Sequence, residues 1–281
     1  MTLIGVFARV FPAAPADDLA LTIAAHGFAT VQLNLSAVGR PTLDETLDTA
    51  SADSIRSAFA GAGLGVWGVS GTFNAVHPDP AARVAGTRGC QAIIRVAPAL
   101  GATAVTLCTG TRDPDDMWRR HPDNALPGAW REMRATLDEL IPVAAEAGVL
   151  LGIEPEVGNV VSDAQAARRL LDELGADARH LTIVLDPANL LTPAGLDRQA
   201  EVLREAFGLL GGQIGCLHAK DVSATGSVAC GLGGLDYALV AELHAGLTQD
   251  PPIIAQDLVP ADAPRVVRFL RDLMGPSGTP T

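Results

Sequence analysis

The chain has 281 residues, of which 48% are hydrophobic, and it carries a formal net charge of −12 at pH 7. The apolar content is too high for a disordered chain, and the length suits a single α/β domain of roughly 250 residues. Because an acidic surface repels phosphate backbones, nucleic acid is not an expected partner.

The sequence also gives no sign of a membrane protein or a disulfide-rich secreted protein. No segment approaches the roughly 18 consecutive apolar residues of a membrane-spanning helix, and the apolar N-terminus lacks a basic start. The four cysteines show no C-x-x-C spacing, which favours reduced thiols. We therefore expect a soluble, cytoplasmic protein without a membrane partner.

Eight short apolar runs recur along the chain, and each is expected to be a strand. Most are apolar at consecutive positions, which is typical of parallel strands buried on both faces. The runs cover residues 3–8, 30–35, 64–71, 104–110, 149–156, 181–187, 213–220 and 252–258.

Helical patterns fill the segments between these runs, for example residues 14–27, 43–63, 82–101 and 129–148. Several end in glycine, a common residue at the end of a helix. Eight strand–helix units predict one α/β domain over residues 1–281, a closed (β/α)8 TIM barrel, with a short flexible tail from about residue 275. A doubly wound open sheet would need a glycine-rich phosphate turn after the first strand, and none is present.

Polar residues close several of the expected strands, where TIM barrels carry their active sites. Glu154, Asp186 and His218 end three consecutive strands at intervals of 32 residues. Neighbouring strands lie about 4.8 Å apart, so these side chains can converge on one ion. Carboxylate and imidazole ligands suit Mn²⁺, Co²⁺, Mg²⁺ or Zn²⁺. The alternative is that each carboxylate caps a helix or pairs with a neighbouring cation.

The alternation of side chains along a strand extends this candidate site. Residues two positions apart share a face, so Glu156 joins Glu154, and Lys220 joins His218. The same rule turns Gln256 toward the barrel axis and Asp257 away from it, unless a bulge shifts the strand.

The strand ends "IEPE", "LDPAN", "LHAKD" and "IIAQDL" resemble those of the xylose isomerase-like TIM barrels, a superfamily of sugar and sugar-phosphate isomerases and epimerases. The resemblance spans essentially the whole chain. It implies a divalent metal ion held by Glu154, Asp186, His218 and the position of Gln256. It also implies that Asn189 contacts the substrate.

Gln256 departs from the glutamate that the epimerases use at this position. A neutral amide is a weaker ligand than a carboxylate, and it cannot act as a general acid or base. Epimerisation by two carboxylates is therefore in doubt. Proton transfer by Glu154 or Glu156, with Lys220 or the metal stabilising an enediolate, remains open, and so does elimination of water.

Two loops supply further candidates for substrate binding. Asn74 and His77 follow the third strand. Arg112 and Trp118 lie in the longest connection, residues 109–128, where a lid would be expected. Arg112 is suited to clamping a phosphate or carboxylate, or to a structural pair with Asp113 or Asp116.

The sequence thus predicts a metal-dependent isomerase or epimerase for a small sugar, sugar phosphate or polyol. Three alternatives remain: an inosose-type dehydratase with the same ion, a metal-free sugar-binding barrel, and, less favoured, an apurinic endonuclease-type nuclease. Homo-oligomerisation is possible, because dimers and tetramers are common in the family that the chain resembles.

Overall fold

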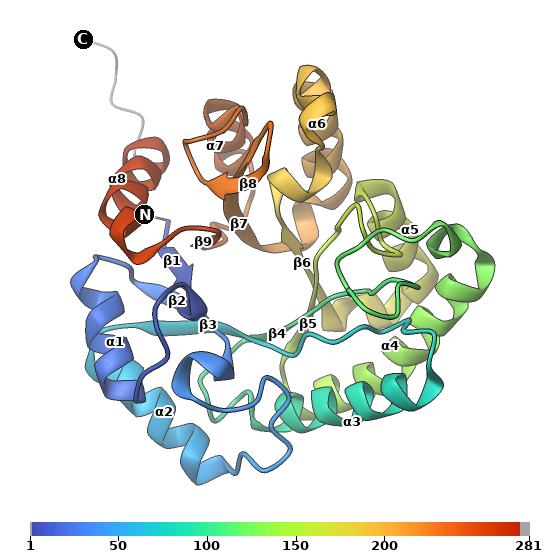
Figure 1. The fold of residues 1–281 in the computed structure, drawn as a ribbon, viewed down its shortest axis with the longest axis horizontal. Coiled ribbons are helices and arrows are strands. Elements are labelled where there is room, and N and C mark those ends of the chain that lie inside the picture. The colour runs from blue at the N-terminus through green and yellow to red at the C-terminus, as the bar shows by residue number, and fades with distance from the viewer. Residues whose placement is uncertain (1, 276–281) are drawn as a thin grey trace.

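The structure is a computed structural model that describes residues 2–275, so the expected C-terminal tail lies outside the described residues (Figure 1). Within the described part, eight parallel strands close into a barrel, because β9 pairs with both β1 and β7. These strands are β1 (Ile4–Phe7), β2 (Thr30–Leu33), β3 (Gly65–Ser70), β4 (Ala104–Leu107), β5 (Leu150–Ile153), β6 (Leu181–Leu185), β7 (Ile214–Ser223) and β9 (Ile253–Ala255). The predicted single TIM barrel and its eight strands are confirmed.

Helices surround the barrel (Figure 1). They are α1 (Ala16–Ala25), α2 (Thr49–Gly61), α3 (Pro80–Val96), α4 (Pro127–Ala147), α5 (Ala164–Leu174), α6 (Gln199–Leu210), α7 (Tyr237–Ala245) and α8 (Ala263–Met274). In α5 the buried residues Ala167, Leu170, Leu171 and Leu174 recur at helical spacing and so form one apolar face. No helix in residues 2–275 is long and apolar enough to cross a membrane.

The second helix begins later than the sequence pattern predicts. We expected a helix over residues 43–63, but α2 starts at Thr49. The Asp48 carboxylate accepts a hydrogen bond from the backbone amide of Ser51 at 2.7 Å, which makes Asp48 the N-cap. Just before it, Asp44 accepts hydrogen bonds from the amide and hydroxyl of Thr46, which stabilise a turn in place of helix.

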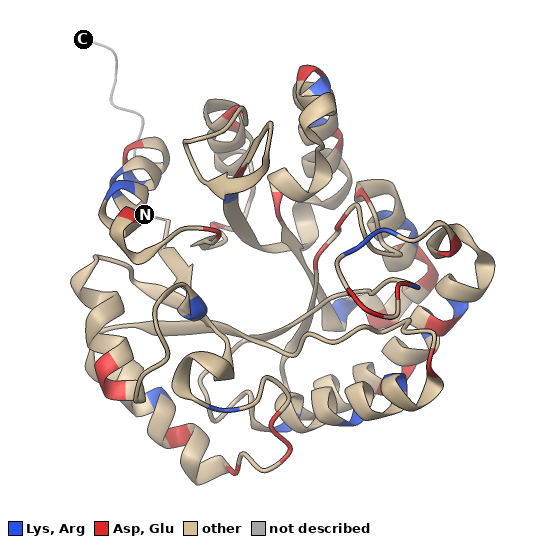
Figure 2. Ribbon diagram, in the orientation of Figure 1, with Lys and Arg blue, Asp and Glu red and all other residues tan. Residues whose placement is uncertain are grey.

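A short strand that was not predicted, β8 (Gly226–Ala229), pairs antiparallel with the end of β7. It extends β7 beyond the barrel into a hairpin at the carboxyl end. Charged residues lie mainly on the outer helices and the loops (Figure 2). Among the barrel strands, only β7 contains charged residues, Lys220 and Asp221. Charge within the barrel is therefore concentrated where β7 reaches the open end.

Candidate metal centre and active site

A pocket of about 480 Å³ opens at the carboxyl end of the barrel, and residues from all eight barrel strands or the loops after them line it. A larger hollow of about 620 Å³ lies at the opposite end, beside α7 and α8. However, the described chain contains one group of His, Asp or Glu side chains close enough to share an ion, and this group lies at the first pocket. The first pocket is therefore the candidate active site.

Three neighbouring strands bring this group together. Glu154 follows β5, Asp186 follows β6 and His218 lies within β7. Each side chain offers one ligand atom, and these atoms all lie within 4.8 Å of one another. Glu154 lines the pocket, whereas Asp186 is fully buried and His218 is 1% exposed, so these two lie below the pocket surface. The convergence expected from the sequence is seen.

Gln32 on β2 orients the imidazole of His218. Its Nε2 donates to Thr106 Oγ1 at 3.0 Å and to Ser70 Oγ at 3.3 Å, which leaves its Oε1 to accept from His218 Nε2 at 2.9 Å. In the neutral imidazole the proton then sits on Nε2, and Nδ1 keeps a free lone pair. Nδ1 lies 3.1 Å from Glu154 Oε1, so the lone pair faces the other candidate ligands.

Glu154 is held from two sides. Its Oε1 also accepts a hydrogen bond from Asn189 Nδ2 at 2.7 Å. Burial acts to raise the pKa of Glu154, but the contact with His218 and the charges of Lys220 and Arg9 bring that pKa below its ordinary value. Glu154 is therefore an ionised, fixed carboxylate.

Asp186 contacts both a cation and an amide. Lys220 Nζ lies 3.5 Å from Asp186 Oδ2, and Gln256 Nε2 donates to the same oxygen at 2.5 Å. Complete burial raises the pKa of Asp186, and Lys220 counteracts only part of this effect. Burial also acts to lower the pKa of Lys220, but the surrounding carboxylates, Asp186 first, raise it above its ordinary value. We conclude that Lys220 is positively charged at neutral pH.

Glu156 shares the pocket with Glu154, as the strand alternation predicts. Burial raises the pKa of Glu156 to about 7, although the ammonium group of Lys220 acts in the opposite direction. A carboxyl group with this pKa can both accept and release a proton near neutral pH. Glu154 and Glu156 thus differ in protonation because their surroundings differ.

Asp257 does not face away from the pocket, and the expectation from strand alternation is wrong at this residue. Its backbone has a φ of 54°, in the left-handed region, so the alternation of β9 ends at Gln256. Asp257 instead lines the pocket, with its Oδ2 3.9 Å from Lys220 Nζ. The hydroxyl of Ser227 on β8 donates to the same carboxylate.

Of the predicted substrate-binding residues, Trp118 and Asn189 line the pocket, whereas Asn74, His77 and Arg112 do not. Asn74 exchanges two hydrogen bonds with the backbone of Thr111, at 2.8 and 2.9 Å. His77 Nε2 lies 3.1 Å from the carbonyl oxygen of Pro114. These contacts fix the loop after β4.

Arg112 has a different partner from the aspartates that we considered. Its Nη1 donates to Glu132 Oε2 on α4 at 2.7 Å and to the Val76 carbonyl at 3.2 Å. Arg119 contacts Asp113 instead. Arg112 is thus engaged in a structural ion pair away from the pocket.

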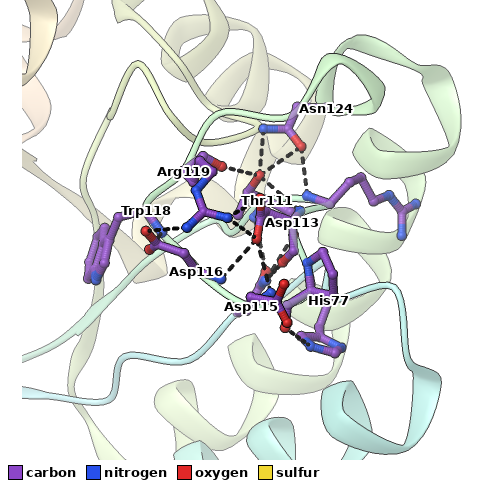
Figure 3. Close-up of polar contacts among 11 residues, drawn as sticks. His77, Thr111, Asp113, Asp115, Asp116, Trp118, Arg119 and Asn124 are labelled. Atoms are coloured by element: carbon purple, nitrogen blue, oxygen red, sulfur yellow. Dashed lines mark hydrogen bonds and ion pairs between the residues drawn. The ribbon is translucent and has the colours of Figure 1, made fainter.

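The loop after β4 is braced internally and presents Trp118 at the rim (Figure 3). The Asp113 carboxylate accepts hydrogen bonds from the amides of residues 115 and 116, and the Asn124 side chain bonds Thr111, the Arg112 amide and the Gly158 carbonyl. Trp118 itself is 49% exposed. The braced backbone therefore positions Trp118 at the pocket, where about half of the residue is exposed.

The donor set of the pocket floor fits a divalent cation. It offers two carboxylates and an imidazole nitrogen whose tautomer is set by Gln32, and the Gln256 amide lies beside them with its Nε2 on Asp186 Oδ2. No thiolate is available there, because the thiol of Cys108 beside the pocket has a pKa raised by burial. Hard or borderline ions such as Mg²⁺, Mn²⁺, Co²⁺ or Zn²⁺ match this set.

Fold and site together define a TIM-barrel protein with a candidate metal centre at the carboxyl end of its strands. The family model for the xylose isomerase-like TIM barrel matches residues 21–255. The chain belongs to this family. No curated protein matches it in sequence.

Solved structures of epimerases are similar over the whole chain. The 3-keto-D-glucoside 4-epimerase YcjR from E. coli has a TM-score of 0.76 at 18% identity, with 97% of this chain and 100% of that chain covered. The D-psicose 3-epimerase from Clostridium cellulolyticum has a TM-score of 0.72 at 14% identity and coverages of 97% and 99%. The D-allulose 3-epimerase from Methylomonas sp. has 0.70 at 17% identity, with 97% and 98% covered. At these identities the likeness shows the shared fold.

Proposed function

We propose that this protein is a divalent-metal-dependent sugar isomerase or epimerase that transfers a proton next to a carbonyl group. The observation that carries the proposal is the cluster of Glu154, Asp186 and His218, whose ligand atoms lie within 4.8 Å of one another at the base of the pocket that Glu154 lines. Three solved structures with the same fold are named as epimerases of sugars, which supports this class of reaction.

When bound, the metal ion would polarise the carbonyl and adjacent hydroxyl oxygens of the substrate as a Lewis acid. Glu154, Asp186, His218 and Gln256 would hold it. Glu156 would take the proton from the carbon next to the carbonyl and return it, because its pKa of about 7 permits both steps at neutral pH.

Lys220 would stabilise the negative charge that develops on the substrate oxygen, since it remains protonated among four carboxylates. Gln256 cannot exchange a proton in this way. The Gln256 position therefore favours a reaction in which one carboxylate serves both proton transfers, such as aldose–ketose isomerisation.

Dehydration of a polyol ketone is the second candidate, and Gln256 is the observation that favours it. Elimination of water next to a carbonyl needs one group to remove the proton from carbon and a proton donor for the leaving hydroxyl. Glu156 and Lys220 can fill these roles without a second carboxylate at residue 256. The two candidates differ in their products, so product analysis separates them.

Solvent deuterium exchange tests the proposal. The protein is incubated in ²H₂O with Mn²⁺ and a set of aldoses, ketoses and inososes, and NMR records deuterium at carbons next to the carbonyl as well as new isomers and dehydration products. We expect exchange that EDTA abolishes and that Glu156→Gln reduces at least 100-fold, within the range for loss of a general base. Glu146→Gln, the same change on the exposed side of α4, is the matched control. Metal-stimulated exchange that survives in Glu156→Gln would refute the role of Glu156, and no exchange with any sugar would refute the reaction.

A further inference from the structure

One buried acceptor in the pocket wall has no partner in residues 2–275. Asn34 follows β2, lines the pocket and is 7% exposed. Its Nδ2 donates to Ser70 Oγ at 2.8 Å, but its Oδ1 receives no hydrogen bond from the described residues. A buried polar atom without a partner is costly, and it is expected where a ligand or water supplies the missing group.

Asp257 places a second acceptor on the same side of the pocket. Its left-handed backbone, with a φ of 54°, is uncommon for a residue other than glycine. The conformation turns the carboxylate to the rim of the pocket, where its side chain is 37% exposed between Ser227 and Lys220. Only part of the acceptor capacity of this carboxylate is thus used within the protein.

The order of the strands places these two residues opposite the proton-transfer group. Asn34 follows β2 and Asp257 follows β9, and β1 pairs with both of these strands. In the ring of eight strands, β1 lies across the barrel from β5, which carries Glu154 and Glu156. A molecule seated against Glu156 is therefore flanked by Asn34 and Asp257 on its other side, with Asp257 also beside Lys220.

We propose that Asn34 and Asp257 form an acceptor wall that binds hydroxyl groups of the substrate other than those held by the metal centre. This inference rests on the proposed function, because it assumes a substrate seated on the metal centre. Both groups accept hydrogen bonds through oxygen, so the wall selects polyhydroxylated ligands. A site built to hydrogen-bond a hydroxyl group discriminates against an analogue that lacks it, since the buried acceptor is then left unpaired.

The test compares ketoses with their deoxy analogues. With Mn²⁺ present, calorimetry measures the affinities of the wild type, Asn34→Ala and Asp257→Gly for D-fructose, D-tagatose and D-sorbose, and then for the singly deoxygenated analogues of the tightest binder. A separate titration with Mn²⁺ alone reports on the metal centre. Asp257→Gly is chosen because glycine adopts the left-handed backbone readily, so the substitution adds no backbone strain. Asn34→Asp, which keeps an acceptor oxygen, is the conservative counterpart of Asn34→Ala.

We expect Asn34→Ala to weaken ketose binding about tenfold, and Asp257→Gly to weaken it about 10- to 100-fold. Affinity for Mn²⁺ should not change in Asn34→Ala. For each variant, one deoxy analogue should bind the variant and the wild type equally well, because the hydroxyl that it lacks is the one bound by the missing side chain. Asn34→Asp should retain more of the discrimination than Asn34→Ala does.

Three results would overturn the acceptor wall: equal weakening for the parent ketose and every deoxy analogue, no weakening in either variant, or no ketose binding by the wild type. Proton exchange and turnover test the proposed function separately. Discrimination that depends on Asn34 and Asp257 without any proton exchange would support the wall and refute the enzyme. Metal-dependent turnover with unchanged discrimination in both variants would support the enzyme and refute the wall.

Discussion

Replacing Gln256 by glutamate should lower the stability of the protein without metal and raise its affinity for metal. In the wild type, Gln256 Nε2 donates to Asp186 Oδ2 at 2.5 Å inside a buried cluster. Gln256→Glu removes this donor and places a second carboxylate against Asp186. Loss of a hydrogen bond to a charged group costs about 1.5–3 kcal/mol in the free energy of unfolding. At about 2–4 °C per kcal/mol, the melting temperature without metal should fall by roughly 3–12 °C.

Metal should reverse this effect, because a third carboxylate adds negative charge to the ligand set. A tenfold gain in affinity adds about 1.4 kcal/mol of stability at saturating ion. The rise in melting temperature caused by Mn²⁺ should then exceed that of the wild type by roughly 3–6 °C. Thermal melts in EDTA and in a Mn²⁺ series measure both quantities.

Gln165→Glu is the matched control for this experiment. Gln165 Nε2 also donates to a carboxylate, that of Glu205, at 2.7 Å, but the pair is exposed on the surface. Its replacement should change stability by less than about 0.5 kcal/mol and should not alter the response to metal. If Gln256→Glu without metal is as stable as this control, or if its response to Mn²⁺ matches that of the wild type, the position assigned to Gln256 beside the ion is refuted.

Three further predictions follow from the contacts around the site. Gln32→Leu leaves His218 Nε2 without its acceptor, so the affinity for Mn²⁺, measured by calorimetry, should fall about 10- to 100-fold. An unchanged affinity would contradict the orienting role of Gln32. Gly110→Ala should lower stability by about 2–4 kcal/mol, because an added Cβ at a φ of 83° would lie 2.3 Å from Asn74 Oδ1 and 2.7 Å from a backbone amide. Gly148→Ala, with a φ of 69° and no atom near the added Cβ, should cost only about 1–2 kcal/mol, and equal losses would argue against the clash. The four cysteines are buried, and burial raises the pKa of their thiols, that of Cys230 to about 12. A thiol reagent at pH 8 should therefore react with them only when the protein unfolds. Rapid labelling of the native protein would contradict this burial.

The barrel strands and the metal-ligand cluster could be predicted because both depend on local patterns. Strands buried on two faces are apolar at consecutive positions, and the residue that ends each one lies at the same rim of the barrel. Glu154, Asp186 and His218 follow this rule. Glu156 and Lys220 follow it as well, because each lies two positions from a member of the cluster.

Other features depend on contacts between distant parts of the chain. Gln32 lies 186 residues from His218, and nothing in the second strand identifies its partner. Asp257 leaves the alternation of β9 through its backbone conformation, and the residue type alone does not require this. Arg112 pairs with Glu132 on α4 although aspartates lie closer in sequence. The hairpin strand β8, Gly226–Ala229, has only four residues and is too short to show a strand pattern.

Metal content tests the central claim most directly. The protein is purified without chelator, and elemental analysis and Mn²⁺ titration are performed on the wild type beside Glu154→Ala and Asp186→Ala. The account predicts one divalent ion per wild-type chain, thermal stabilisation by that ion, and loss of both in the two variants. A wild type that neither retains a divalent ion nor gains stability from Mn²⁺, Co²⁺, Mg²⁺ or Zn²⁺ would contradict the metal centre and favour a sugar-binding barrel.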